Sequence, residues 1–248
     1  MSDKLHHTKG IVLRSVKYGE TSLIVTLFTS LFGLQSYIIN GVRTASQKGS
    51  NKANLFQPPA ILDMVVYHNE LKQLNRIREY KWAVLYQQLF SDVKKNAVAL
   101  YMTELLTRCL RQPETNEDLF HFAEDAFLHL DEASSSIAAN FPLFFALQLP
   151  AFFGFGIHDN YSDKRPFLDL QEGEFTAERP AHPHFLDEKQ SSVTSDFLKT
   201  RIPAELEHIR LNQEFRRNLL LAYEKYYAFH VHEFGSLKTL PVLREILS

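Results

Sequence analysis

Seven positively charged side chains in the first third of the chain are the residues best suited to bind a partner. Three of them lie between Gly33 and Leu55, a stretch that has no acidic residue and breaks into a loop at Asn40-Gly41. The others lie on the predicted strands before and after this loop. The set is Arg14, Lys17, Arg43, Lys48, Lys52, Arg76 and Arg78. Clustered Lys and Arg neutralise phosphates, so we expect these residues to contact a nucleic acid.

Aromatic residues near these cations could hold bases by stacking. The candidates are Tyr18, Tyr37 and Tyr67. For each of them the alternative is partial burial in the wall of the β-module.

Signatures of catalysis are absent from the sequence. It contains no P-loop, no dinucleotide-binding glycine fingerprint, no nucleophile elbow and no His-Glu-x-x-His pair. His158, His182 and His184 could in principle hold a metal, but His-x-His without a convincing fourth ligand favours a solvated loop. We therefore expect no catalytic residue, no metal and no cofactor.

The formal net charge of −2 is unevenly divided along the chain. Residues 1–80 hold 10 Lys and Arg against 5 Asp and Glu, whereas residues 81–248 hold 17 against 24. This asymmetry predicts a basic module that meets an anion and an acidic body that does not. The single cysteine, Cys109, excludes an internal disulfide, and its position on an apolar helix stripe predicts a buried small side chain. An N-terminus without a signal-type stretch, and the lack of a continuous apolar run of about 18 residues, predict a cytoplasmic protein.

The first third of the chain has the pattern of a small barrel. Five runs rich in β-branched and apolar residues alternate with turn signals, and they cover residues 8–16, 21–29, 34–42, 60–68 and 71–79. An SH3-like barrel would fit almost as well as an OB fold. The OB fold is favoured because the first three strands form a meander and the long loop precedes the fourth strand.

Helical periodicity follows from Tyr80 onward. We expect helices between Trp82 and Leu110, after a cap at Asn116, from Ser136 toward Phe155, and from Asn212 to Phe234. Pro142 should lie near the first turn of the third of these helices, and Pro150 should kink or divide it. Residues 156–192 read as irregular, with short hairpin-like pieces around Phe167 and Phe175.

Several short segments are similar to one family. They are Gly10 to Arg14 (GIVLR), Tyr18 to Thr21 (YGET), Leu27 to Thr29 (LFT), Gly33, Gly41 to Arg43 (GVR) and the strand with Pro58, followed by Tyr101 to Leu106 (YMTELL) and Leu237 to Leu240 (LKTL). In this order and spacing the chain resembles the RecO family of bacterial recombination mediators. The resemblance spans most of the chain.

The resemblance implies an α+β protein without catalytic turnover. Its parts would be a five-stranded OB-fold barrel at 1–80 and an all-helical domain at 81–248 with an irregular insert at 156–192. Many members carry a four-cysteine zinc module in this region. Here that region has no cysteine, which puts the zinc in doubt and requires other contacts to hold the segment.

The resemblance also implies partners. Such proteins bind single- and double-stranded DNA, anneal complementary strands, and work with RecR to load RecA onto DNA coated by single-stranded-DNA-binding protein. They also contact the acidic C-terminal tail of that coating protein. Arg14, Lys17 and Arg43 match the basic barrel pattern of the family most directly. Arg108 and Arg111 are candidates for the acidic tail by residue type, with compensation of a helix dipole as the alternative.

Two other classes of function stay open from the sequence. One is an adaptor whose basic barrel binds an acidic protein. The other is a small-molecule enzyme that uses an unrecognised site among the helices.

Overall fold

The computed structural model describes residues 4–43, 53–69 and 71–247, and the chain forms two compact units. The first unit comprises Met1–Tyr86 and Leu110–Phe127, and the second comprises Gln87–Cys109 and Leu128–Ser248. The units are thus interleaved along the chain. The domain boundary predicted at residue 80 stays a proposal. The compact units meet after Tyr86 instead, and Leu110–Phe127 belongs to the first unit.

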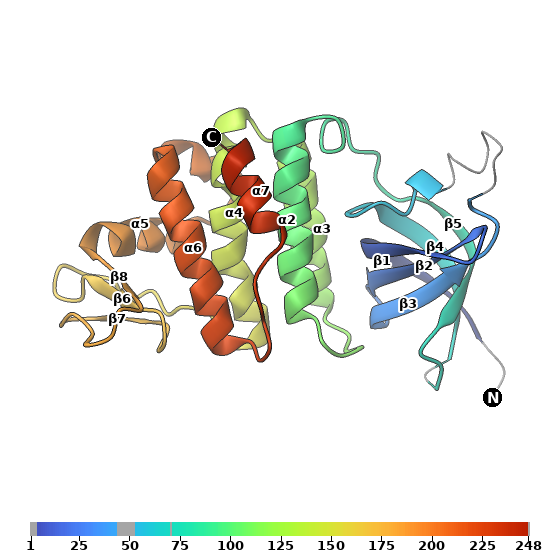
Figure 1. Ribbon diagram of the computed structural model, residues 1–248, viewed down its shortest axis with the longest axis horizontal. Helices are drawn as coiled ribbons and strands as arrows, with labels where there is room; N and C mark the ends of the chain where they lie inside the picture. Colours follow the sequence, from blue (N-terminus) through green and yellow to red (C-terminus); the bar gives the residue numbers. More distant parts are fainter. Residues whose placement is uncertain (1–3, 44–52, 70, 248) are drawn as a thin grey trace. The chain divides into compact units, whose positions relative to one another are not determined.

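The first unit contains a closed five-stranded barrel with strand order β1-β2-β3-β5-β4 (Figure 1). Its strands are β1 Lys4–Tyr18, β2 Ser22–Thr29, β3 Gly33–Ile39, β4 Ile61–His68 and β5 Asn75–Trp82. The β3–β5 pair is parallel, whereas the other pairs are antiparallel, including the β1–β4 pair that closes the barrel. This Greek-key order is the expected OB-fold arrangement rather than the SH3-like alternative.

Alternating side chains fill the barrel. Inward residues on neighbouring strands stand opposite one another, as Val25 does between Ser15 and Tyr37. The buried inner set includes Val12, Leu23, Val25, Leu27, Tyr37, Ile39, Leu62, Met64 and Val66. The register shifts between Val12 and Arg14 on β1 and between Val65 and Val66 on β4. Such bulges strengthen the local twist, which a small barrel needs in order to close.

The fifth strand begins later than the sequence pattern indicates. It starts at Asn75 rather than at residue 71, and residues 71–74 form a turn. The side chain of Asn75 accepts the backbone N–H of Asn69 at 3.1 Å, which ties the two ends of this turn together. The prediction placed the strand start too early because Leu71 and Leu74 are apolar and were counted as strand residues.

Residues 110–127 complete the first unit. They include the first part of helix α3 (Glu117–Glu132), whose start is capped by Asn116 as predicted: the Asn116 side chain accepts the Leu119 N–H at 2.9 Å. The Phe120 ring packs on Phe28 of β2 with centroids 5.6 Å apart. Lys9 of β1 donates to the buried carboxylate of Glu124 at 2.8 Å. These contacts cover one side of the barrel.

Helices form most of the second unit. They are α2 Val93–Cys109, α4 Ser135–Gln148, η1 Leu149–Phe153, α5 Glu188–Lys199, η2 Pro203–His208, α6 Gln213–His230 and α7 Thr239–Ile246. In Figure 1 α2, α4 and α6 lie side by side, and α4 contacts both neighbours. The helix predicted from Ser136 toward Phe155 divides near Pro150, as expected: α4 ends at Gln148 and η1 begins at Leu149. Pro142 lies inside α4 rather than near its first turn, and it is buried there.

The α4–η1 stretch from Ser135 to Phe153 is long and apolar enough to cross a membrane by length and composition. The stretch is not a continuous apolar run, because Asn140 and Gln148 interrupt it, so the criterion applied to the sequence did not detect it. Most of this stretch is buried inside the structure, as in a core helix. Its small and aromatic side chains, including the buried Phe141, Phe144 and Phe145, pack against neighbouring elements of the unit.

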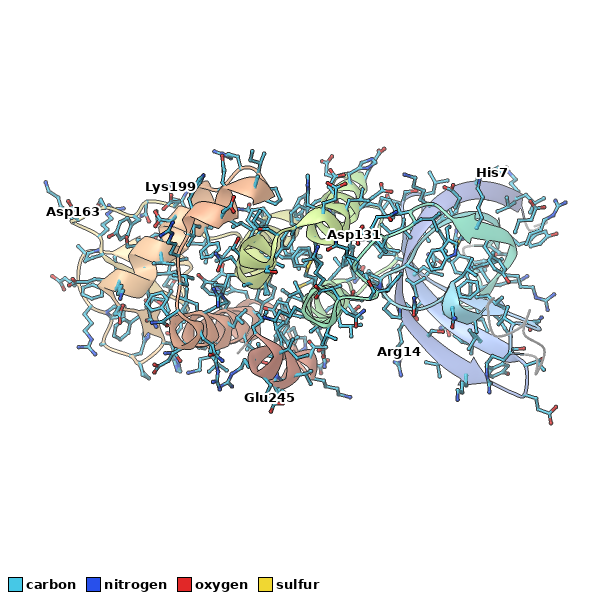
Figure 2. All side chains as sticks on the ribbon, turned by 90° about the horizontal axis from the view of Figure 1, so that it is seen from above. His7, Arg14, Asp131, Asp163, Lys199 and Glu245 are labelled. Carbon is cyan, nitrogen blue, oxygen red and sulfur yellow. The ribbon has the colours of Figure 1, made fainter. Side chains whose placement is uncertain are left out.

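The predicted helix after Trp82 begins at Val93 instead. Trp82 belongs to β5, and residues 87–89 are held by Asp131 near the end of α3, a residue that Figure 2 labels. The Asp131 carboxylate accepts the backbone N–H groups of Gln87, Gln88 and Leu89 at 2.8, 2.8 and 2.6 Å. The start of α2 at Val93 is set by Asp92, whose side chain accepts the backbone N–H groups of Lys94 and Lys95 at 2.8 and 3.0 Å.

Helix α7 is fixed to α2 by a carboxylate. Glu104 accepts the backbone N–H of Lys238 at 3.0 Å and both the N–H and the hydroxyl of Thr239 at 2.8 and 2.7 Å. Arg108 donates to the same carboxylate at 3.4 Å. Burial alone would raise the pKa of Glu104, but these hydrogen bonds outweigh it, so the pKa lies below its usual range. Glu104 therefore caps a helix that follows it by more than a hundred residues.

The insert at 156–192 keeps its shape without cysteines. Strands β6 (Phe167–Asp169), β7 (Glu174–Thr176) and β8 (Phe185–Leu186) form a small sheet in the order β7-β6-β8. The second domain is thus not all-helical, although the pieces around Phe167 and Phe175 lie where the sequence predicts them. His182 lies 3.1 Å from the buried carboxylate of Asp169, which also accepts backbone N–H groups of the β6–β7 turn. Across the described residues, no three His, Cys, Asp or Glu side chains meet as a metal site.

Candidate nucleic-acid interface

One strip of the barrel surface carries two of the predicted cations. Arg14 stands opposite Thr26, which stands opposite Ser36, and the next row of outward residues runs Val16, Ile24, Ile38, Arg76 across β1, β2, β3 and β5. We call these seven residues the outer strip. Arg14 projects from the barrel wall, as Figure 2 shows, and Arg76 is likewise exposed. The two arginines are separated by three strand spacings, or about 14 Å across the sheet.

The cations of the outer strip are not neutralised. Within the described ranges Arg14, Arg76 and Lys17 make no ion pair. Elsewhere on the barrel the pattern differs, because Lys9 pairs with Glu124 at 2.8 Å and Lys81 lies 3.9 Å from Asp63. Uncompensated positive charge on an exposed surface attracts polyanions, and salt screens this attraction.

Arg43 is held at the turn between β1 and β2. Its backbone N–H donates to the Thr21 carbonyl at 3.0 Å, and its guanidinium donates to the Gly19 carbonyl at 3.2 Å. The end of β3 is fixed to the same hairpin by Ser22, whose hydroxyl donates to the Asn40 side chain at 3.1 Å. Lys48 and Lys52 lie outside the described residues.

Lys17 and Arg78 differ from the strip in their placement. Lys17 stands opposite the inward Leu23, so it shares the inner register of β1 and is exposed only because it lies at the strand end. Arg78 is the extra residue at the bulge between β4 and β5, where Ile77 pairs with Val66 and Glu79 with Val65. Its guanidinium lies 3.3 Å from the Glu79 carboxylate, with both side chains exposed. The structure therefore brings together Arg14 and Arg76 but not the whole predicted set.

The three tyrosines have different environments. Tyr37 is fully buried inside the barrel, where burial raises the pKa of its phenol, so the expectation that it could hold a base was wrong. Tyr67 stands opposite Arg76 on the outer face, and it is half-buried. Tyr18 is 53% exposed at the end of β1, beside the turn that holds Arg43. Tyr18 and Tyr67 keep the surface that stacking requires.

The two arginines predicted to meet an acidic tail also differ. Arg108 is engaged within its own unit, where it donates to Glu104 and, at 3.3 Å, to the Ser236 carbonyl. Arg111 is exposed. Binding of an acidic tail by either residue stays a prediction.

Sequence reasoning missed a groove that adjoins the outer strip. The groove has a volume of about 620 Å³ and contains the outward residues Thr26 and Ser36 of the strip, whose hydroxyl oxygens lie 3.5 Å apart. We call it the barrel groove; its other lining residues are Leu31, Phe32, Leu34, Gln35, His68, Leu71, Lys72, Gln73, Pro113 and Thr115. Phe32 and His68 are stacked there, with ring centroids 3.8 Å apart and an interplanar angle of 14°. No local pattern links residues so far apart in the sequence, so no signal could have revealed it.

Comparison with known proteins identifies the family. Residues 1–86 match the family model described as "Recombination protein O N terminal", and residues 90–241 match "Recombination protein O C terminal". The chain is 35% identical to the DNA repair protein RecO of Christiangramia forsetii, over 98% of this chain and 99% of that protein. It is 32% identical to the same-named protein of Phocaeicola vulgatus, over 98% and 100%, and 31% identical to that of Flavobacterium johnsoniae, over 97% and 98%. The chain therefore belongs to the RecO family of DNA repair proteins.

Proposed function

We propose that this protein is a DNA-binding recombination mediator that acts without catalytic turnover. In this role it binds single- and double-stranded DNA, anneals complementary strands, and helps RecR load RecA onto DNA coated by single-stranded-DNA-binding protein. Membership of a DNA repair family supports the role. The observation that carries it is the outer strip, where Arg14 and Arg76 face solvent from one side of an OB barrel and have no ion-pair partner among the described residues.

Annealing follows from the chemistry of such a surface. Arginines that neutralise phosphates reduce the repulsion between two strands and leave their base edges free to pair. Contacts to phosphate carry no sequence information, so we expect little sequence preference. Each lost phosphate contact should reduce the slope of log affinity against log salt by about 0.7 for a single strand.

The test compares two charge changes on one barrel. In the Arg14→Ala, Arg76→Ala double variant we expect weaker binding to an oligonucleotide and a salt slope that is smaller by about 1.4. Lys81→Ala is the control, because Lys81 is an exposed barrel cation that already has an acidic neighbour, Asp63. A double variant with the same affinity and slope as the control would overturn the assignment of the surface.

An annealing assay tests the mediator role itself. Complementary oligonucleotides, with and without the coating protein, would be mixed with this protein. We expect it to accelerate annealing in both cases, and we expect the double variant to lose this acceleration. A separate assay with RecR and RecA would measure loading. Binding to an acidic protein without any acceleration of annealing would favour an adaptor instead.

A further inference from the structure

We propose that the barrel groove is a base-binding subsite that lets this protein prefer unpaired DNA over duplex. The inference rests on the proposed function, because it concerns bases of the same DNA whose phosphates would contact Arg14 and Arg76. It assigns a second task to the barrel: the outer strip would hold the backbone, while the groove would hold bases.

The chemistry of the groove fits a nucleobase. None of the lining residues that the structure describes is Asp or Glu, although a second groove on the same barrel is lined by both Asp63 and Glu79. Amide and hydroxyl side chains, including Gln35 and Gln73, supply both donors and acceptors for base edges. Phe32 and His68 supply aromatic surface, and leucines supply an apolar rim. A π face and hydrogen-bonding groups beside it are what an unpaired base requires.

Phe32 is held in place by its turn. Its N–H donates to the Thr29 hydroxyl at 3.1 Å, and its carbonyl accepts the Gln35 amide at 2.9 Å. The His6 ring meets Phe32 edge-on, with centroids 5.1 Å apart. The aromatic pair is thus fixed before any ligand arrives, which lowers the entropic cost of stacking.

The position of the groove connects bases to phosphates. Thr26 lies in the groove and stands directly opposite Arg14 across the β1–β2 pair. A strand with its phosphate at Arg14 would therefore have its base within reach of the groove. A duplex cannot use the groove in this way, because its base faces are covered by their neighbours in the stack.

The experiment separates bases from backbone. Binding of the full chain is measured to an oligothymidylate, to an abasic oligonucleotide of the same length, and to a duplex. We expect the wild type to bind oligothymidylate more tightly than the abasic strand, by at least about fivefold, the effect of one base–aromatic stack. Phe32→Leu keeps an apolar side chain but removes the π face. It should lose most of this preference, with unchanged affinity for the abasic strand and the duplex.

A second variant keeps the test valid if Phe32→Leu disturbs the fold. Leu71 is 86% exposed on the groove rim, so Leu71→Ser should leave the fold intact and weaken binding to oligothymidylate alone. The matched control is Leu85→Ser, at a leucine of the same unit that is 70% exposed and outside the groove.

Two failures can be told apart. Equal affinity of the wild type for the oligothymidylate and the abasic strand, or full preference in both groove variants, would overturn the subsite while leaving the proposed function intact. An absence of binding to all three DNAs would overturn the proposed function itself. Binding of an apolar peptide in the groove that DNA does not displace would also refute the subsite.

Discussion

Replacing Asp131 by alanine should destabilise the second unit severely. The side chain is almost fully buried and accepts three consecutive backbone N–H groups, those of Gln87, Gln88 and Leu89. A hydrogen bond to a charged acceptor contributes about 1.5 to 3 kcal/mol, and a buried donor left without an acceptor costs a similar amount. Leu89 is fully buried, so its N–H would bear the full cost of losing its acceptor. Gln87 and Gln88 are exposed, so water can replace part of the hydrogen bonding that their N–H groups lose.

The expected loss follows from these three bonds. We assign about 2 kcal/mol to the Leu89 N–H and about 1 kcal/mol to each of the other two, which gives roughly 4 kcal/mol. Such a loss is a large part of the 5 to 15 kcal/mol that usually stabilises a domain. Asp131→Asn keeps one acceptor oxygen, so about half of this loss is expected. Lys95 should stay in place in both variants, because its ammonium donates to the Asp131 backbone carbonyl and to Gln88 rather than to the carboxylate.

Urea denaturation followed by circular dichroism would measure this loss. The control is Asp125→Ala, which removes an exposed carboxylate from the same helix. The reasoning would be refuted by an Asp131→Ala variant within about 1 kcal/mol of the control. It would also be refuted if Asp131→Asn were as damaging as alanine, because the estimate counts acceptors.

Three further changes give distinct outcomes. Gly33→Ala should lower the stability by more than about 2 kcal/mol, because Gly33 has a φ of +61° and an added Cβ would lie 2.1 Å from the Glu114 carbonyl oxygen. The control is Gly41→Ala, at φ +69° with open space, which should lower the stability by only about 1 kcal/mol; thermal denaturation measures both. The pKa of Glu104 is lowered in the folded state, so its contribution to stability is present above the ordinary carboxyl pKa and is lost as pH falls through the folded pKa. Glu104→Gln should therefore flatten the acid side of a curve of stability against pH. An unchanged curve would contradict the cap on α7. Changing Arg43, Lys48 and Lys52 together to alanine should weaken DNA binding and lower the salt slope in a filter-binding titration, and an unchanged affinity would remove this loop from the interface.

The sequence was most informative where local chemistry decides the structure. Alternating apolar residues marked all five barrel strands, because each strand buries one face. Asn116 and Pro150 marked a helix start and a helix division through their own side chains. Family resemblance then supplied the order in which these elements assemble.

Features that depend on distant partners could not be predicted. Alternation placed Tyr37 on one of two faces of β3, but only closure of the barrel decides that this face is the interior. The backbone of residues 87–89 is held by Asp131, a residue more than forty positions away. The barrel groove gathers residues of three separate stretches, so its composition has no counterpart in any window of the sequence.

Charge counting shows the same limit within the candidate interface. Lys9 and Arg14 are both basic residues on β1, yet Lys9 donates to a buried Glu124 carboxylate whereas Arg14 faces solvent without an acidic neighbour among the described residues. The Lys9–Glu124 pair joins the barrel to residues 110–127 and therefore serves the fold. Arg78, which the sequence placed in the same set as Arg76, is partly neutralised by Glu79. A count of basic residues over residues 1–80 thus combines structural and available charge. The ion pairs and the register of the strands separate the two, and they leave Arg14 and Arg76 on one outer strip beside a groove whose described lining residues include no carboxylate.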